Sequence, residues 1–205
     1  MKILAPIILI SRRLMKKRKL LVILIIVLLA LIFLWRQKAT RDQVDEGLVY
    51  PQGSLQAEKS LQQALDAKSQ DKPDQAIAFI EPVYRGDPDN ILCLEVYAWA
   101  KYRQRNYDQS VELYQKLVEK SRTATYLSYL GNALRDTGKN GEAIKAYEQA
   151  IELNINFNTA YQNLINVYKA QNWQGKKNLV AFLQTQASNT NNKVAGRYLE
   201  EVLKQ

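Results

Sequence analysis

The sequence repeats itself at an interval of about 34 residues. The segment SVELYQKLVE at 110–119 recurs as AIKAYEQAIE at 143–152, and AIAFIEPVY at 76–84 begins 34 residues before the first of these. The segment NTAYQNLINVYKAQNW at 158–173 follows the pattern of residues 124–139. Within each copy, apolar residues recur at helical spacing, and short polar loops divide the copy into two helices. A single copy cannot bury its apolar face alone, so the pattern predicts a stack of helix pairs.

The copy at 124–157 carries small and aromatic residues in a specific order. It resembles the tetratricopeptide repeat (TPR), whose first helix, turn and second helix are matched here by Leu127, Leu130, Gly131, Leu134, Gly138, Ala143, Tyr147 and Ala150. Glycine and alanine let paired helices cross closely, while tyrosine fills the gap between neighbours. The second and fourth copies depart from the pattern at Lys101 and Lys177, where an aromatic and a small residue are usual.

This resemblance implies an all-α fold, an α-solenoid of about four TPR helix pairs with a C-terminal capping helix. The domain covers 57–205, with its repeats at about 57–90, 91–123, 124–157 and 158–191 and its cap at 192–205. The cap has an apolar stripe on one side, as expected of a helix that covers an open repeat edge.

The N-terminal part of the chain predicts a membrane anchor. Sixteen apolar residues run from Leu20 to Trp35, and seven basic residues precede them in 1–19. A helix of this length rises about 24 Å, and flanking basic side chains extend its reach. A cleaved signal peptide is the alternative, but the charged sequence RQKATR follows where small residues would mark a cleavage site. We therefore predict a transmembrane signal-anchor helix at 20–35 and a linker at 36–56.

The distribution of basic residues predicts the orientation of this anchor. The positive-inside rule keeps 1–19 in the cytoplasm and exports the TPR domain to the extracytoplasmic side, most simply the bacterial periplasm or the cell exterior. Residues 1–41 hold ten of the 29 basic residues and no acidic one, which leaves 19 basic against 20 acidic residues in 42–205. The net charge of +9 is therefore not a nucleic-acid footprint, and we expect no nucleic-acid partner.

The residue types that are missing exclude several kinds of site. The chain has no histidine and one cysteine, Cys93, so an internal disulfide, a Cys/His zinc site and histidine-based nucleophilic catalysis are all excluded. We expect no enzyme activity, no metal and no cofactor, and we expect Cys93 to be a small buried residue. An intermolecular disulfide through Cys93 is the alternative.

The resemblance also points to a ligand surface. In TPR proteins the first helices line a concave groove, and residues beside the packing positions contact ligand. Here these residues are Asn132, Asn163, Asn166, Lys193 and Arg197. Four of them, without Asn166, match the spacing of the carboxylate clamp of TPR co-chaperones, and Ser128 stands at the position of the clamp's first lysine. An ordinary solvated helix surface is the alternative interpretation.

A second candidate for the groove is aromatic. Trp99 and Tyr102 should face the concavity from their positions in the second repeat, whereas Tyr107 falls at the turn between helices. Aromatic anchors are favoured in interfaces, although packing between repeats explains such residues equally well. Trp173 is predicted to lie in the core.

Together these features predict a membrane-anchored adaptor or scaffold. Its partner would be a protein or peptide held in the groove, and its place would be in secretion or in the assembly of envelope complexes. The alternative is a periplasmic chaperone-like holder of unfolded or translocating clients. A groove rich in exposed apolar surface would favour the holder, and a polar groove would favour the adaptor.

Overall fold

The computed structural model describes residues 32, 49–190 and 192–205. Residues 49–205 form one compact unit. The predicted transmembrane segment at 20–35 lies outside the described residues except for Ile32, and 1–19 and 36–48 lie outside them entirely. Within the part of the chain that is described, no helix combines the length and the apolar character needed to cross a membrane.

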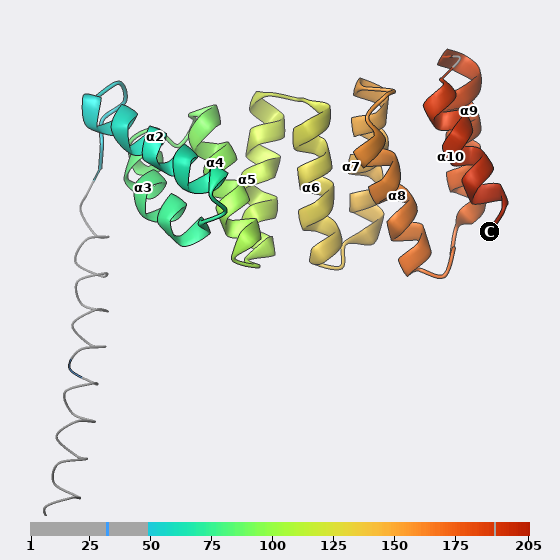
Figure 1. Ribbon diagram of the computed structural model, residues 1–205, viewed down its shortest axis with the longest axis horizontal. Coiled ribbons are helices and arrows are strands. Elements are labelled where there is room, and N and C mark those ends of the chain that lie inside the picture. Colours follow the sequence, from blue (N-terminus) through green and yellow to red (C-terminus); the bar gives the residue numbers. More distant parts are fainter. Residues whose placement is uncertain (1–31, 33–48, 191) are drawn as a thin grey trace, which may run out of the picture. The chain divides into compact units, whose positions relative to one another are not determined.

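The described residues form nine helices and no strands. In chain order the helices are α2 (Leu55–Ser69), α3 (Pro73–Gly86), α4 (Ile91–Arg103), α5 (Tyr107–Lys120), α6 (Ala124–Asp136), α7 (Asn140–Leu153), α8 (Asn158–Ala170), α9 (Lys176–Thr190) and α10 (Lys193–Leu203). Each of α2 to α7 packs against the next helix along the chain, and α2, α6 and α8 also contact α4, α8 and α10 respectively (Figure 1). The predicted all-α solenoid is confirmed for this part of the chain.

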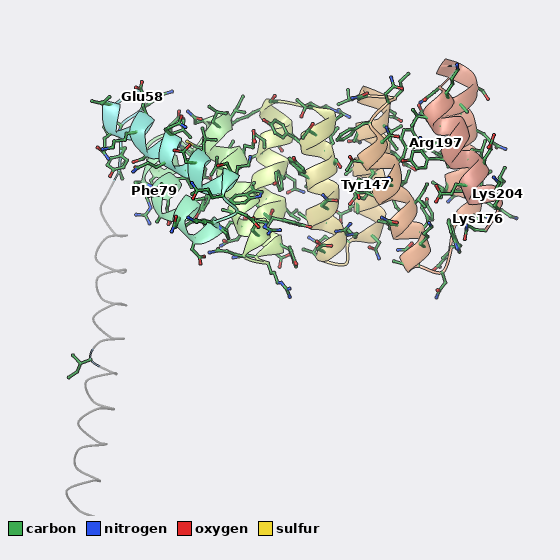
Figure 2. The ribbon with its side chains drawn as sticks, in the orientation of Figure 1. Glu58, Phe79, Tyr147, Lys176, Arg197 and Lys204 are labelled. Carbon is green, nitrogen blue, oxygen red and sulfur yellow. The ribbon has the colours of Figure 1, made fainter. Side chains whose placement is uncertain are left out.

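The third repeat shows why small residues are needed where helices cross. A Cβ atom added to Gly131 on α6 would lie 2.6 Å from Cε1 of Tyr147 on α7. Tyr147, labelled in Figure 2, lies on α7. It is completely buried, as are Ala143 and Ala150 on the same helix. The missing side chain at 131 therefore leaves room for the tyrosine ring, which fills the space between the two helices.

The fourth repeat differs from the other three in how closely its two helices, α8 and α9, pack together. The packing of α9 is against α10, whereas α8 and α9 approach each other less closely than any other consecutive pair of helices. The turn between α8 and α9 contains Asn172 and Trp173, both with positive φ. Lys177, at a position where these repeats usually carry a small residue, is exposed on α9. Trp173 is half-buried at the edge of the core, beside Lys169 and Lys176, so the prediction of a core position holds only in part.

The end of the predicted linker is part of the folded unit. The backbone N–H of Tyr50 donates to the carbonyl oxygen of Pro82 on α3 at 3.1 Å. The carbonyl oxygen of Tyr50 lies where a side chain at Gly86 would begin, at 1.9 Å from an added Cβ, so only glycine fits there. Ser54 caps α2 by accepting from the N–H of Ala57 at 3.1 Å. Residues 49–54 of the linker predicted at 36–56 therefore pack as part of this unit, and 55–56 lie in α2.

Cys93 is fully buried on α4, as expected. Burial, with a smaller contribution from the Asp87 carboxylate, raises the pKa of its thiol to about 11. The thiol is therefore protonated at neutral pH and packs as a small apolar group.

Candidate functional site

The candidate site lies mainly on helices α4, α6 and α8, and side-chain caps set the starts of α4 and α6. Asn90 caps α4 by accepting from the N–H groups of Leu92 and Cys93, and Thr123 caps α6 by accepting from the N–H of Tyr126 at 3.1 Å. Such caps satisfy N–H groups that have no partner within the helix. They fix where each helix begins, and hence which residues face the neighbouring helices.

Asn132 and Asn163 form a pair of amide side chains between α6 and α8. Oδ1 of Asn132 accepts from Nδ2 of Asn163 at 3.0 Å and from the hydroxyl of Tyr147 at 2.8 Å. Both asparagines are half-buried. The two bonds to Oδ1 orient the Asn132 amide, with Nδ2 on the opposite side of the group.

The amide nitrogen of Asn132 remains available to a ligand. Within the described residues, Nδ2 of Asn132 has no hydrogen-bond partner. Every buried side-chain nitrogen or oxygen in the same part of the chain does have a partner, so this nitrogen is in contact with solvent. An amide N–H donates to carboxylate and carbonyl oxygens. Asn132 is therefore held ready to donate to such an oxygen.

A cavity of about 240 Å³ borders Asn132. It is lined by side chains from α4, α5 and α6, namely Trp99, Tyr102, Arg103, Tyr114, Tyr129 and Asn132. Tyr114 is 3% exposed, and the 40% exposed Tyr129 ring lies over it at a centroid distance of 5.7 Å and an interplanar angle of 45°. Four of the six lining residues are aromatic, so the cavity presents both ring faces and ring edges.

The charged groups near this cavity are paired. The hydroxyl of Tyr102 donates to Oδ2 of Asp136 at 2.6 Å, and Nε of Arg135 donates to Oδ1 of the same carboxylate at 2.8 Å. Burial, followed by the bond to Asp136, raises the pKa of Tyr102 to about 12. Arg103 forms an ion pair with Asp71. No lining residue carries a carboxylate, so the cavity suits a neutral group.

The structure brings some of the predicted site residues together. Trp99, Tyr102 and Asn132 line the same cavity, and Asn163 is bonded to Asn132. The aromatic and amide candidates, which were separate predictions, therefore meet at Asn132. Asn166 is exposed on α8 and forms no side-chain hydrogen bond within the described residues.

The two predicted cations lie on α10. Nη2 of Arg197 donates to Oδ1 of Asn158 at 2.6 Å, and its guanidinium lies 5.0 Å from the ring centroid of Tyr198 (Figure 2). Lys193 is exposed and forms no ion pair within the described part of the chain. Ser128 is 1% exposed, so the position of the clamp's first lysine offers no cation to a ligand. Asn132 and Asn163 are thus paired between α6 and α8, whereas both predicted cations lie on α10, which contacts α8 and α9.

Three lining residues were not predicted from the sequence, namely Arg103, Tyr114 and Tyr129. Tyr129 precedes Asn132 by three residues and Arg103 follows Trp99 by four, spacings that put each pair on one helix face. That signal was present in the sequence. Tyr114 is buried in the core, and it also lines the cavity.

Comparison with known proteins relates part of the chain to one repeat family. Residues 97–156, which include all six residues that line the cavity and the Gly131–Tyr147 contact, match the family model for the tetratricopeptide repeat. The tetratricopeptide repeat family is therefore supported for this chain. No curated protein matches the chain in sequence. Among the described residues, no group of three or more His, Cys, Asp and Glu is arranged to hold a metal ion.

Solved TPR structures resemble the chain over much of its length. The first TPR of Spaghetti (RPAP3), bound to the HSP90 peptide SRMEEVD, is 25% identical, covers 60% of this chain and 97% of its own, and has a TM-score of 0.53. The first TPR domain of human RPAP3 is also 25% identical, covers 60% of this chain and 95% of its own, and has a TM-score of 0.52. MamA is 19% identical, covers 73% of this chain and 87% of its own, and has a TM-score of 0.56, a likeness of fold alone.

Proposed function

We propose that this TPR domain is a non-catalytic adaptor that captures a peptide segment of a partner protein. TPR proteins mediate protein–protein interactions, and the RPAP3 domain holds a peptide in its solved structure. The observation that carries the proposal is the solvent-facing Nδ2 of Asn132, oriented by Tyr147 and Asn163 beside an aromatic cavity. A peptide offers both a matching oxygen acceptor and a side chain for the cavity.

The ligand group that best fits the polar side of this site is a C-terminal carboxylate. Asn132 and Asn163 supply amide donors, and Lys193 and Arg197 supply two positive charges. Hydrogen bonds to an ionised group are roughly twice as strong as neutral ones. Because Ser128 is buried and uncharged, binding depends on the amide pair and on the cations of α10.

A peptide-binding comparison tests this function. The full-length chain is titrated with a fluorescent peptide pool randomised over its last four positions, in free-acid and C-terminally amidated forms. We expect amidation to weaken binding roughly tenfold, because one charge and its hydrogen bonds are lost. Asn163→Ala and Arg197→Gln should each reduce the preference for the free acid, whereas Asn178→Ala, an exposed asparagine on α9, should not. Equal binding of both pools by the unchanged protein would refute carboxylate capture.

A chaperone-like holder of unfolded clients is the second candidate. The partly exposed aromatic ring of Tyr129 and the exposed Ile91 and Leu92 at the start of α4 favour it. A holder binds apolar sequences wherever they occur in a chain, so it would bind acid and amide pools equally. The paired polar groups around the cavity favour the adaptor. The same titration therefore separates the two functions.

We further propose that the adaptor works at a membrane, with the TPR domain on the extracytoplasmic face and a role in secretion or envelope assembly. The support is the apolar run at 20–35 and the excess of basic residues before it. After expression of the full chain in bacteria, alkaline washing should leave it in the membrane fraction. Protease added to spheroplasts should digest 49–205, and full protection of this unit would contradict the proposed orientation.

A further inference from the structure

The cavity beside Asn132 has the size and shape for one large side chain. Its volume is about 240 Å³, below the roughly 300–1,000 Å³ of pockets that hold whole small molecules. The buried ring of Tyr114 closes one side, and the partly exposed ring of Tyr129 lies near the surface. A space of this kind is suited to a single anchoring residue, the usual centre of an interface.

The lining chemistry favours an aromatic side chain. Trp99, Tyr102, Tyr114 and Tyr129 surround the space, and aromatic rings attract one another in tilted and offset arrangements. Arg103 adds a guanidinium group, which interacts favourably with the face of an aromatic ring. The neighbouring carboxylates of Asp71 and Asp136 are already paired with protein donors, so they do not compete for a cationic side chain.

The position of the cavity identifies which residue of the peptide would enter it. Asn132 is part of the amide pair and also of the cavity wall. An extended peptide advances about 3.3 Å per residue, so two peptide groups that both contact the Asn132 side chain belong to the same residue or to adjacent residues. We propose that the cavity is a subsite for the aromatic side chain of a peptide's C-terminal residue, or of the residue just before it.

This inference rests on the proposed peptide-binding function and adds selectivity to it. Where a clamp of the co-chaperone type has a lysine, this chain has the buried, uncharged Ser128. The aromatic cavity is lined on the same helix by Tyr129, the next residue, and by Asn132, one turn further along. We therefore expect this site to select the end of a peptide less by its charge and more by an aromatic side chain.

Four peptides test the inference together with the function on which it rests. The full-length chain is titrated with fluorescein-labelled Gly-Ser-Gly-Ser-Gly-Phe and Gly-Ser-Gly-Ser-Gly-Ala, each as free acid and as amide. We expect the phenylalanine acid to bind roughly tenfold more tightly than the alanine acid, a difference typical of a filled anchor pocket. Free acids that bind equally well, but better than both amides, would overturn the subsite and leave carboxylate capture intact. If neither these peptides nor the randomised pool binds better as free acid than as amide, both the subsite and carboxylate capture are refuted.

Variants at Tyr129 test whether the preference for phenylalanine arises in this cavity. Tyr129→Ala should remove most of the preference for phenylalanine while leaving the difference between acid and amide, and Tyr129→Phe should retain the preference. Because Tyr129 is 40% exposed, its truncation leaves the core in place. Leu153→Ala, which truncates a 50% exposed residue on α7 outside the cavity, is the control. An unchanged phenylalanine preference in Tyr129→Ala would show that the selectivity arises elsewhere.

Discussion

Tyr147 links the packing of the third repeat to its candidate binding site, because its hydroxyl donates to Oδ1 of Asn132 at 2.8 Å. The ring of the same residue fills the space that Gly131 leaves open. Gly131 and Asn132 are adjacent in sequence, so one tyrosine contacts a packing position and a binding position at once. The orientation of the Asn132 amide is thereby set by the scaffold rather than by solvent.

Replacing Gly131 by alanine tests this packing relationship. Alanine is the better helix former, by about 1 kcal/mol, but its Cβ would lie 2.6 Å from the ring of the fully buried Tyr147. Overpacking of this kind typically costs about 1–3 kcal/mol, so we expect a net loss of stability in Gly131→Ala by urea denaturation.

Gly196 provides the matched control for this substitution. It lies inside α10, and an added Cβ meets no atom within 4 Å. Gly196→Ala should therefore raise stability by up to about 1 kcal/mol. If both substitutions stabilise the protein, the ring of Tyr147 moves aside easily and the close contact at Gly131 has no energetic consequence.

Tyr147→Phe separates the hydroxyl from the ring. The ring stays in its place, so we expect a stability loss of only about 1 kcal/mol, the usual value for one hydrogen bond. Asn132 then keeps only the bond from Asn163, so its amide is held less firmly. Affinity for free-acid peptides should fall roughly two- to fivefold, which corresponds to part of one hydrogen bond. Unchanged affinity, measured by fluorescence anisotropy, would show that Asn163 alone orients Asn132.

The helical repeats and their packing residues could be predicted because they follow from periodicity. Apolar spacing located the helices, and Gly131, Ala143 and Tyr147 indicated how closely they cross. Packing depends on size and apolar character, which the sequence displays directly. The loose packing of α8 against α9 was harder to predict. Lys177 indicated a departure from the repeat pattern, but it did not show that α9 packs on α10 instead.

The candidate site was predictable as a surface but not as a set of contacts. Register placed Asn132, Asn163, Trp99 and Tyr102 on first helices, and three of these four share a cavity. Which of the two amides donates and which accepts depends on side-chain rotamers and on helix crossings, and a sequence does not display either. Two contacts could not be predicted for this reason: the hydrogen bond from Arg197 to Asn158, and the position of Tyr114 in the cavity wall.

Asn192 shows how much one polar residue contributes at the capping helix. It is 5% exposed, and its Oδ1 caps α10 by accepting from the N–H groups of Val194 and Ala195. Its Nδ2 donates to the carbonyl oxygen of Ile155 at 2.8 Å and to the hydroxyl of Tyr161 at 2.9 Å. Asn192→Ala should lower stability by about 2 kcal/mol in urea denaturation, through the lost cap and the groups left without a partner.

Asn192→Asp distinguishes these two contributions. A carboxylate keeps the helix cap, but it cannot donate and it faces the carbonyl oxygen of Ile155. We expect this variant to be destabilised at pH 7 and to recover part of the loss at low pH, where a protonated carboxyl can donate. Wild-type stability of Asn192→Asp at pH 7 would mean that only the cap matters.

Glu95 should make the stability of the first repeats depend on pH. Burial would raise the pKa of this carboxyl, but hydrogen bonds from Lys68 on α2 and Tyr126 on α6, with the charge of Lys68, lower it below its ordinary value. The ionised form is thus favoured by folding. The stabilisation is complete above the pKa of an unfolded glutamate, about 4.3, and is lost as the pH falls through the lower pKa of the folded state. We expect Glu95→Gln to reduce the free energy of unfolding by about 1–2 kcal/mol at pH 7 and by less at pH 3.

Glu81→Gln is the control for this pH dependence. Glu81 forms an exposed ion pair with Arg85 one turn away on α3, at 3.1 Å, and such pairs contribute about 0.3–0.5 kcal/mol. Its substitution should change stability by no more than this at either pH. Denaturant unfolding of both variants at pH 7 and pH 3 makes the comparison. A cost of Glu95→Gln that is the same at both pH values would mean that the shape of the side chain, and not its charge, holds α2, α4 and α6 together.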